Sequence, residues 1–219
     1  MDNKTIQIKD FPLFAGLNDQ ALDVLLKGAI KKTFPKNTIL FSEGDKTDSL
    51  YVICSGKVKV TITDKDGKEI ILSMLGPGEY FGEMSLLDSE PRSATVMTRE
   101  ATELLIVSKN NLMEIFSSNP IAFNLLKGLL NRLREANKKI EGLALLDVYG
   151  RVARLLNQLA KPLDQKMVVG DKLTHQEIAN TIGSSREMVS LILKELSNGD
   201  YITVDKKTIT INKKLPYSW

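Results

Sequence analysis

Residues 80–94 bring a glycine, a carboxylate and a guanidinium close together in the sequence. Gly82 has no side chain, so a ligand can approach its backbone closely. Residues 83–87 predict one short helical turn, whose unpaired N–H groups and positive dipole end would face an anion. Pro91 is expected to end this turn and to deliver Arg92, whose planar fork can hold a phosphate with two parallel hydrogen bonds. The stretch therefore predicts a phosphate-binding site.

Two neighbouring side chains extend this prediction from a phosphate to a sugar phosphate. Ser93 adds a hydroxyl and a backbone N–H beside Arg92. Glu83 would repel a phosphate, so its expected role is to accept a hydrogen bond from a sugar hydroxyl. The alternative is a simple turn with the arginine in a surface ion pair, because short motifs also occur by chance.

The composition is that of an ordinary globular protein. The chain has 219 residues, of which 42% are hydrophobic and 26% charged, and this length fits one large domain or two small ones. No apolar run approaches 18 residues and residues 1–4 are polar after the methionine, so we expect a cytoplasmic protein without a membrane span. The single cysteine, Cys54, excludes an internal disulfide, a zinc site built from cysteines and an iron–sulfur cluster with thiolates from one chain.

The N-terminal half reads as a short helix followed by strands. Residues 19–31 carry leucines at helical spacing, and from residue 38 onward the apolar period changes to two. In residues 57–62, apolar side chains alternate with Lys57, Lys59 and Thr61, which predicts a half-buried strand. Gly67 favours a hairpin turn before the returning strand of residues 69–75. Many short strands with closely spaced turns predict a closed antiparallel roll or barrel.

The middle of the chain predicts one long helix with a dimer seam. After Pro120 the helical pattern continues to about Leu146, with apolar residues spaced three and four apart. The residues of this heptad seam are Leu126, Leu129, Leu133, Ala136, Ile140 and Leu143. A helix packed only on its own domain is the alternative. The regular stripe with a second apolar flank favours a homodimer.

The C-terminal part predicts a helix-turn-helix with a wing. Asp147 can cap a helix over residues 148–159, and residues 174–177 form a capping box before a short helix that Gly183 ends. Residues 184–187 read as a second capping box before another helix, and residues 201–211 as a β-hairpin. Residues 151–219 hold eleven Lys or Arg against seven Asp or Glu, a mildly basic balance that suits a polyanionic partner.

Three segments resemble known families. The Gly-Glu pair at Gly82 and the Arg-Ser-Ala triplet at Arg92 resemble the phosphate-binding cassette of cyclic-nucleotide-binding domains, and residues 143–153 and 184–190 resemble the cyclic-AMP receptor protein (catabolite activator) family of bacterial regulators. The resemblance covers essentially the whole chain. It implies an α+β fold with a cyclic-nucleotide-binding β-roll in residues 1–118, a dimerisation helix and hinge in residues 119–146, and a winged helix-turn-helix DNA-binding domain in residues 147–219.

The resemblance also implies an allosteric ligand, most simply cyclic AMP, with no metal, haem or iron–sulfur cluster. The ligand residues would be Ser73, Gly82, Glu83, Arg92, Ser93 and Ala94, with Ala136 and Asn137 on the long helix. In the family, two positions that usually carry hydroxyls meet the purine, and they align with Ala136 and Asn137. Asn137 can still offer a donor and an acceptor to adenine, whereas Ala136 cannot. We expect the purine to lie over the gap that Ala136 leaves in the seam.

For DNA, the resemblance implies a pseudo-palindromic double-stranded site read by a homodimer. Arg186 would bind guanine and Glu187 would accept from cytosine in the major groove. Ser185 and Thr174 would contact phosphates, with Gln176 as a further contact. Leu191 stands where close relatives have a second base-reading arginine. RNA polymerase is a partner by resemblance, and residues 161–166 are the loop expected to contact it.

Other functions remain as alternatives to control by cyclic AMP. The same fold can respond to a cyclic dinucleotide or act without a ligand. Sensing through a cluster or haem is disfavoured because Cys54 is the only cysteine and His175 the only histidine. An enzyme such as a nucleotide hydrolase is disfavoured because the sequence offers no metal constellation and no nucleophile–base pair. We therefore expect a DNA-binding transcription regulator and no catalytic residues.

Overall fold

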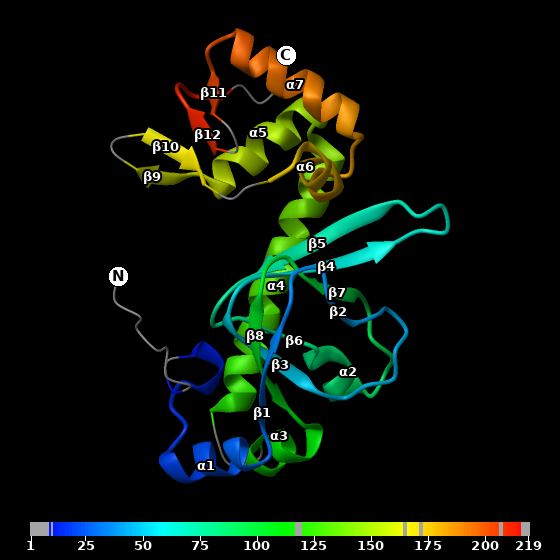
Figure 1. The fold of residues 1–219 in the computed structure, drawn as a ribbon, viewed down its shortest axis with the longest axis vertical. Coiled ribbons are helices and arrows are strands. Elements are labelled where there is room, and N and C mark those ends of the chain that lie inside the picture. The colour runs from blue at the N-terminus through cyan, green and yellow to red at the C-terminus, as the bar shows by residue number, and fades with distance from the viewer. Residues whose placement is uncertain are drawn as a thin grey trace. The chain divides into compact units, whose positions relative to one another are not determined.

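The computed structural model describes residue 9 and residues 11–116, 120–163, 166–170, 173–205 and 208–215, with the backbone alone for residues 115 and 116. The chain divides into two compact units, Met1–Leu133 and Arg134–Trp219. The division falls inside the long helix α4, Ile121–Leu145 (Figure 1). The domain boundaries expected at residues 118 and 146 remain predictions.

The first unit is built from antiparallel strands and short helices. Its described elements are η2 (Pro12–Phe14), α1 (Asp19–Lys27), β1 (Ile30–Phe34), β2 (Ile39–Phe41), β3 (Leu50–Ser55), β4 (Val58–Thr63), β5 (Glu69–Leu75), β6 (Tyr80–Phe81), α2 (Glu83–Asp88), β7 (Thr95–Thr98), β8 (Thr102–Val107), α3 (Lys109–Phe116) and the first part of α4. One sheet has the order β1-β8-β3-β6 and the other β2-β7-β4-β5. The two sheets confirm the predicted antiparallel β-roll.

Apolar side chains from both sheets meet in one core. Successive side chains of a strand point to opposite faces, so each sheet can present one apolar face inward. The residues of this core are Phe41, Ile53, Val58, Leu75, Phe81, Val96 and Leu104. Strand β6 is only two residues long, yet Phe81 lies in this core and fixes the start of the turn that follows.

A second apolar cluster joins one of the sheets to the helices. It combines Leu50 and Val52 of β3 with Leu25 of α1, Leu112 of α3 and Leu125 of α4. The predicted helix of residues 19–31 was too long. Asn18 caps its start, but α1 ends at Lys27 and β1 begins at Ile30, because the last residues pair with β8 instead.

The alternation predicted for residues 57–62 holds only in part. Val58 is buried as expected, but Thr61 is only 3% exposed although it was expected to face outward. The pairing register of β4 and β5 shifts between Val60 and Thr61. A β-bulge of this kind places two residues of one strand against one of its partner and interrupts strict alternation. The shift leaves Ser73 paired with Val60.

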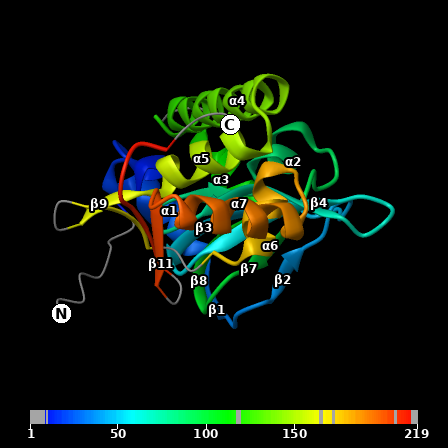
Figure 2. The ribbon, with the colours of Figure 1, turned by 90° about the horizontal axis from the view of Figure 1, so that it is seen from above.

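The second unit contains the end of α4 and a small helical domain with a sheet. Its described elements are α5 (Val148–Leu159), β9 (Lys161–Leu163), β10 (Lys166–Val169), α6 (His175–Ile182), α7 (Arg186–Asn198), β11 (Ile202–Asp205) and β12 (Thr208–Ile211). The sheet order is β11-β12-β10-β9. Helices α6 and α7 lie side by side in both views (Figures 1 and 2). The winged helix-turn-helix is therefore confirmed.

Helix ends in this unit test the predicted caps. Asp147 Oδ1 accepts from the Gly150 N–H at 2.7 Å, and Thr174 forms the predicted capping box with Glu177. The second predicted box was wrong. Ser185 rather than Ser184 is the N-cap of α7, and its hydroxyl accepts from the Met188 N–H at 3.2 Å. The helix therefore starts one residue later than the box implied, and its first two residues are Arg186 and Glu187.

Two predicted turns fall partly outside the described residues. Residues 161–166 were expected to form a loop, but Lys161–Leu163 and Lys166–Val169 pair as the antiparallel strands β9 and β10. Residues 164 and 165 between them lie outside the described residues, as do residues 206 and 207 of the wing turn. The wing itself consists of β11 and β12, as predicted.

Candidate functional site

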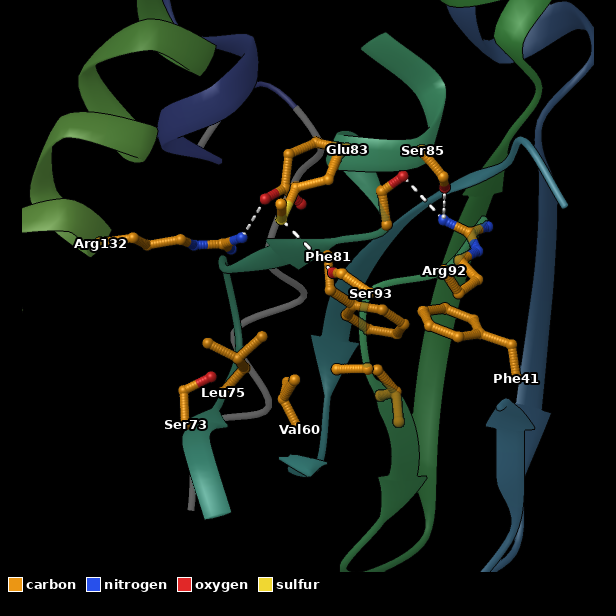
Figure 3. A pocket seen from close by; sticks show the side chains of 14 residues that line it. Phe41, Val60, Ser73, Leu75, Phe81, Glu83, Ser85, Arg92, Ser93 and Arg132 are labelled. Carbon is orange, nitrogen blue, oxygen red and sulfur yellow. Dashed lines mark hydrogen bonds and ion pairs between the residues drawn. The ribbon is translucent and has the colours of Figure 1, made fainter. Parts of the chain in front are cut away.

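A pocket opens in the first unit between the turn that follows β6 and side chains of β4, β5 and β7 (Figure 3). It spans about 440 Å³ when the space at its mouth is included. Its lining residues are Phe41, Val60, Ser73, Leu75, Phe81, Gly82, Glu83, Met84, Ser85, Arg92, Ser93, Ala94, Val96 and Arg132. Every residue predicted for ligand binding in the β-roll thus lines one pocket.

Gly82 forms the tight turn between β6 and α2. Its φ is +85°, in the left-handed region that strongly favours glycine. A Cβ atom at this position would lie 2.5 Å from Nη1 of Arg92 and 2.8 Å from the carbonyl oxygen of Ser49. The absence of a side chain therefore lets the arginine lie directly against the backbone. Helix α2 then runs to Asp88, and Ser89 ends it in the left-handed conformation, before Pro91.

Arg92 is only 2% exposed, and protein oxygens accept from most of its guanidinium. Nε donates to Oγ1 of Thr47 at 2.7 Å, and Nη2 donates to the carbonyl oxygen of Ser49 at 2.8 Å. Nη1 donates to the carbonyl oxygen of Gly82 at 2.8 Å and to Oγ of Ser85 at 2.7 Å. Four of the five N–H groups of the fork are thereby engaged. The guanidinium is held in the lining of the pocket, because another rotamer of Arg92 would break these hydrogen bonds.

Aromatic rings surround the same cation. The guanidinium carbon lies 4.1 Å from the centroid of the Phe41 ring and 5.7 Å from that of Tyr51. Burial lowers the pKa of Arg92, an effect opposed by the phenol of Tyr51 and the carboxylate of Asp48. Arginine nevertheless stays charged in proteins. The pocket therefore contains a fixed positive charge with little water around it, which strengthens its attraction for an anion.

Glu83 is the second buried charge, and its partner was not predicted from the sequence. The Glu83 side chain is 3% exposed and forms an ion pair with Arg132 of α4. Arg132 also donates to the carbonyl oxygen of Tyr80, and its guanidinium carbon lies 4.9 Å from the Tyr80 ring centroid. Burial raises the pKa of the Tyr80 phenol, and the charge of Arg132 opposes this. The sequence signal for Arg132 was weak, because a basic residue beside a heptad seam is usually exposed.

The remaining predicted ligand residues occupy different places. Ser73 of β5 and Ala94 line the pocket, and the hydroxyl of Ser93 lies 3.5 Å from the sulfur of Met84. Ala136 and Asn137 lie further along α4, where both side chains are exposed. Their contact with a purine stays a prediction.

The pocket joins a buried cation, a buried carboxylate and hydroxyl groups around an apolar wall. Arg92 and the backbone of α2 suit an anion, while the carboxylate of Glu83 keeps acceptor capacity beyond its ion pair. Val60, Leu75 and Val96 provide a surface for a flat apolar group. A ligand with a phosphate, a hydroxylated sugar and a ring matches this set. The site offers recognition rather than bond cleavage.

The second candidate site is the exposed face of α6 and α7. Ser185, Arg186 and Glu187 are all exposed at the start of α7. Thr174 uses its hydroxyl in the capping box, so its contact with a phosphate would involve the rest of this exposed turn. Nε2 of Gln176 donates to Oδ1 of Asn180 at 2.7 Å. The predicted contact residues thus lie at the N-terminal ends of two packed helices.

Helix α7 is fixed in the domain by its opposite face. Val189, Ile192, Leu193 and Leu196 are buried in the core that also holds α5 and α6. Nδ1 of His175 and Oγ of Ser190 lie 2.8 Å apart, and Ser190 Oγ donates to the carbonyl oxygen of Arg186. The start of α6 is therefore tied to Ser190, in the second turn of α7. This rigid placement is what reading of a base pair requires.

Two negative observations apply to the described part of the chain. No helix there is both long enough and apolar enough to cross a bilayer. No three histidine, cysteine or acidic side chains gather there in a way that could hold a metal ion.

Comparison with known families assigns both sites to known domains. The family model of the cyclic nucleotide-binding domain matches residues 31–119, and that of the Crp-like helix-turn-helix domain matches residues 150–214. The first range contains the cassette with Gly82, Glu83 and Arg92, and the second contains α6 and α7. The ligand class and the DNA-binding domain expected from the sequence are thereby confirmed.

Whole-chain relatives agree with this assignment. The cyclic AMP receptor protein of Thermus thermophilus is 36% identical over 211 residues, covering 94% of each chain. The cAMP-activated global transcriptional regulator CRP of Salmonella typhimurium is 37% identical, covering 88% of this chain and 94% of its own. Among solved structures, the c-di-GMP responsive global regulator CLP of Xanthomonas campestris has a TM-score of 0.78 and 28% identity, covering 90% of this chain and all of its own.

A cyclic-nucleotide-binding domain and a helix-turn-helix domain in one chain define a DNA-binding transcription regulator. The relatives named above are regulators rather than enzymes. The chain belongs to the CRP family of bacterial transcription regulators.

Proposed function

We propose that this protein is a homodimeric regulator whose affinity for a pseudo-palindromic DNA site is controlled by cyclic AMP. The nucleotide binds in the pocket of the β-roll, and the two α7 helices of the dimer enter successive major grooves. Ligand binding can shift the DNA-binding equilibrium only by its different affinity for the two states of the protein.

The observation that carries the proposal is that Arg92 and Glu83 line the same pocket and are both nearly inaccessible to water. Arg92, Ser93 and the α2 backbone would hold the cyclic phosphate, and Glu83 the ribose hydroxyl. A grip by two N–H groups has to take over at least one that now donates to Thr47, Ser49, Gly82 or Ser85. If the phosphate takes an N–H of Nη1, which now donates to Gly82 and Ser85, its binding would be coupled to a small shift of α2.

The choice of cyclic AMP is supported by the relatives and by the pocket. The proteins from Thermus thermophilus and Salmonella typhimurium are named for cyclic AMP. Ser73 and Val60 offer one polar and one apolar contact for a purine. Cyclic di-GMP is the second candidate, because the structurally similar CLP of Xanthomonas campestris responds to it.

Dimerisation is supported by the surface of α4. Leu126, Leu133, Ile140 and Leu143 are 53–63% exposed in a single chain, all at positions of the predicted heptad seam. Exposed leucines in such a regular row are typical of a coiled-coil contact. RNA polymerase as a partner, through residues 161–166, stays a prediction.

Isothermal titration calorimetry with cyclic AMP, cyclic GMP, cyclic di-AMP and cyclic di-GMP tests the ligand. We expect cyclic AMP to bind most tightly, with one site for each chain of the dimer. Tighter binding of cyclic di-GMP would select the second candidate. Heat from none of the four nucleotides would refute control by a cyclic nucleotide.

A further inference from the structure

Helix α7 carries a large apolar side chain on the face that the rest of its domain leaves open. Leu191 is 52% exposed, whereas Val189, Ile192, Leu193 and Leu196 on the other side are buried. Leu191 lies four residues after Glu187, so one helical turn brings the two side chains onto the same face. Lys194, three residues further on, is also exposed there.

An exposed leucine between two charged residues is unexplained by the packing of the domain. The core of this unit is complete without Leu191. The chain has a helix-turn-helix domain, and in such domains the second helix, here α7, enters the major groove with its solvent-facing side. In the major groove, thymine alone presents a methyl group, and apolar side chains contact it. A leucine can neither donate nor accept a hydrogen bond, so the polar edges of the other bases offer it no partner.

We propose that Leu191 is a specificity-determining residue that reads the 5-methyl group of a thymine in each half-site. This rests on the proposed function, because it requires α7 to lie in the major groove. The turn between Glu187 and Leu191 advances about 6 Å along the helix. Base pairs are stacked about 3.4 Å apart. The thymine therefore lies within about two base pairs of the pair that Glu187 contacts.

The methyl group can be removed from DNA without any other change, since uracil differs from thymine only by this group. The operator is first obtained by selection from random duplexes with the full-length protein and saturating cyclic AMP. Each thymine of the half-site is then replaced by uracil, one at a time, and affinity is measured by fluorescence anisotropy. Burial of one methyl group predicts about a fourfold loss at one position for each half-site.

Variants locate the effect at Leu191. In the Leu191→Ala variant, the same uracil replacement should change the DNA affinity by less than about 1.5-fold, compared with about fourfold in the wild type. Ile39→Ala is the matched control, because Ile39 is also 52% exposed but lies on β2. That variant should keep the full uracil effect. A cytosine–guanine pair at the sensitive position should bind the wild type more tightly when the cytosine carries a 5-methyl group, whereas Leu191→Ala should not distinguish the two duplexes.

The outcomes separate this inference from the proposed function. If the selection yields a specific operator but no uracil replacement matters, or Leu191→Ala keeps the same sensitivity, the thymine contact is refuted while DNA recognition stands. If the selection yields no specific operator, both fail. Thermal melting of Leu191→Ala should match that of the wild type, because the side chain adds little to the core.

Discussion

At Arg92, one buried cation connects two separate parts of the chain. Thr47 and Ser49 precede β3, while Gly82 and Ser85 belong to the turn and helix after β6, and all four accept from the same guanidinium. The residue that we assign to the phosphate is therefore also a structural link. Its substitution must affect stability and binding together, and the two effects have to be measured separately.

Replacement of Arg92 by leucine leaves several buried oxygens without their donor, which should lower the free energy of unfolding by at least about 2 kcal/mol. Loss of two charge-assisted hydrogen bonds to phosphate should weaken cyclic AMP at least about 100-fold. Urea unfolding and calorimetry measure the two effects. Arg92→Lys keeps the charge without the fork, and we expect it to fold better than Arg92→Leu. Unchanged cyclic AMP affinity in the folded Arg92→Lys variant would contradict a two-bond grip.

At the scale of elements, β6 and α4 fit together through a glycine. The phenol of Tyr80 donates to the carbonyl oxygen of Leu125 at 3.3 Å. Gly128 lies one turn from Leu125, and a Cβ atom there would overlap the Tyr80 oxygen. The notch at Gly128 therefore sets how closely the helix approaches the strand that leads into the pocket. Arg132 follows one turn later and reaches Glu83 from the same side of α4.

Gly128→Ala should lower stability although alanine favours helices. Overpacking costs about 1–3 kcal/mol, which we expect to exceed the gain of about 1 kcal/mol in helix propensity. Gly142→Ala is the control on the same helix, because its new Cβ atom would meet only the flexible end of Arg154, at 3.1 Å. Urea titrations followed by circular dichroism measure both. Tyr80→Phe removes the atom with the worst overlap and should rescue Gly128→Ala in part. Equal stabilisation by the two alanines would show that the notch is unimportant.

At the scale of the whole molecule, the exposed apolar row on α4 supports the proposed homodimer. Each leucine that is buried in a dimer stabilises it by about 1.5–3 kcal/mol. A buried, unpaired carboxylate in its place would destabilise the dimer by several kcal/mol. Leu133→Glu should therefore shift the protein to monomers in sedimentation velocity. Lys127→Glu changes a charge outside the seam and should leave the dimer intact. A Leu133→Glu protein that still sediments as a dimer would place the interface elsewhere.

Local patterns in the sequence were sufficient for much of the fold. Glycine turns and period-two strands predicted the roll, a three–four apolar spacing predicted α4, and caps at Asp147 and Thr174 fixed the starts of α5 and α6. The same reasoning failed at Thr61, because a shift in strand register depends on the partner strand. It also chose Ser184 over Ser185 as a cap, since adjacent serines offer the same chemistry.

The residue types and their spacing predicted the site only where its residues are close in sequence, whereas Ser73 was expected from the family resemblance. Gly82, Glu83, Arg92 and Ser93 form one local motif and line one pocket. Arg132 was missed because its pairing with Glu83 spans 49 residues and depends on how α4 packs on β6. The occupied hydrogen bonds of Arg92 were also unforeseen. Their acceptors include carbonyl oxygens, which every residue has and which no pattern distinguishes.

The most direct test of this account is operator affinity, measured by fluorescence anisotropy with and without saturating cyclic AMP, in the wild type and in Arg92→Lys. The account predicts that cyclic AMP raises the affinity of the wild type for its selected site by at least tenfold, about 1.4 kcal/mol of coupling. The variant should need far more nucleotide to reach the same affinity. Identical operator affinity at every concentration of cyclic AMP and of the other three nucleotides would contradict it.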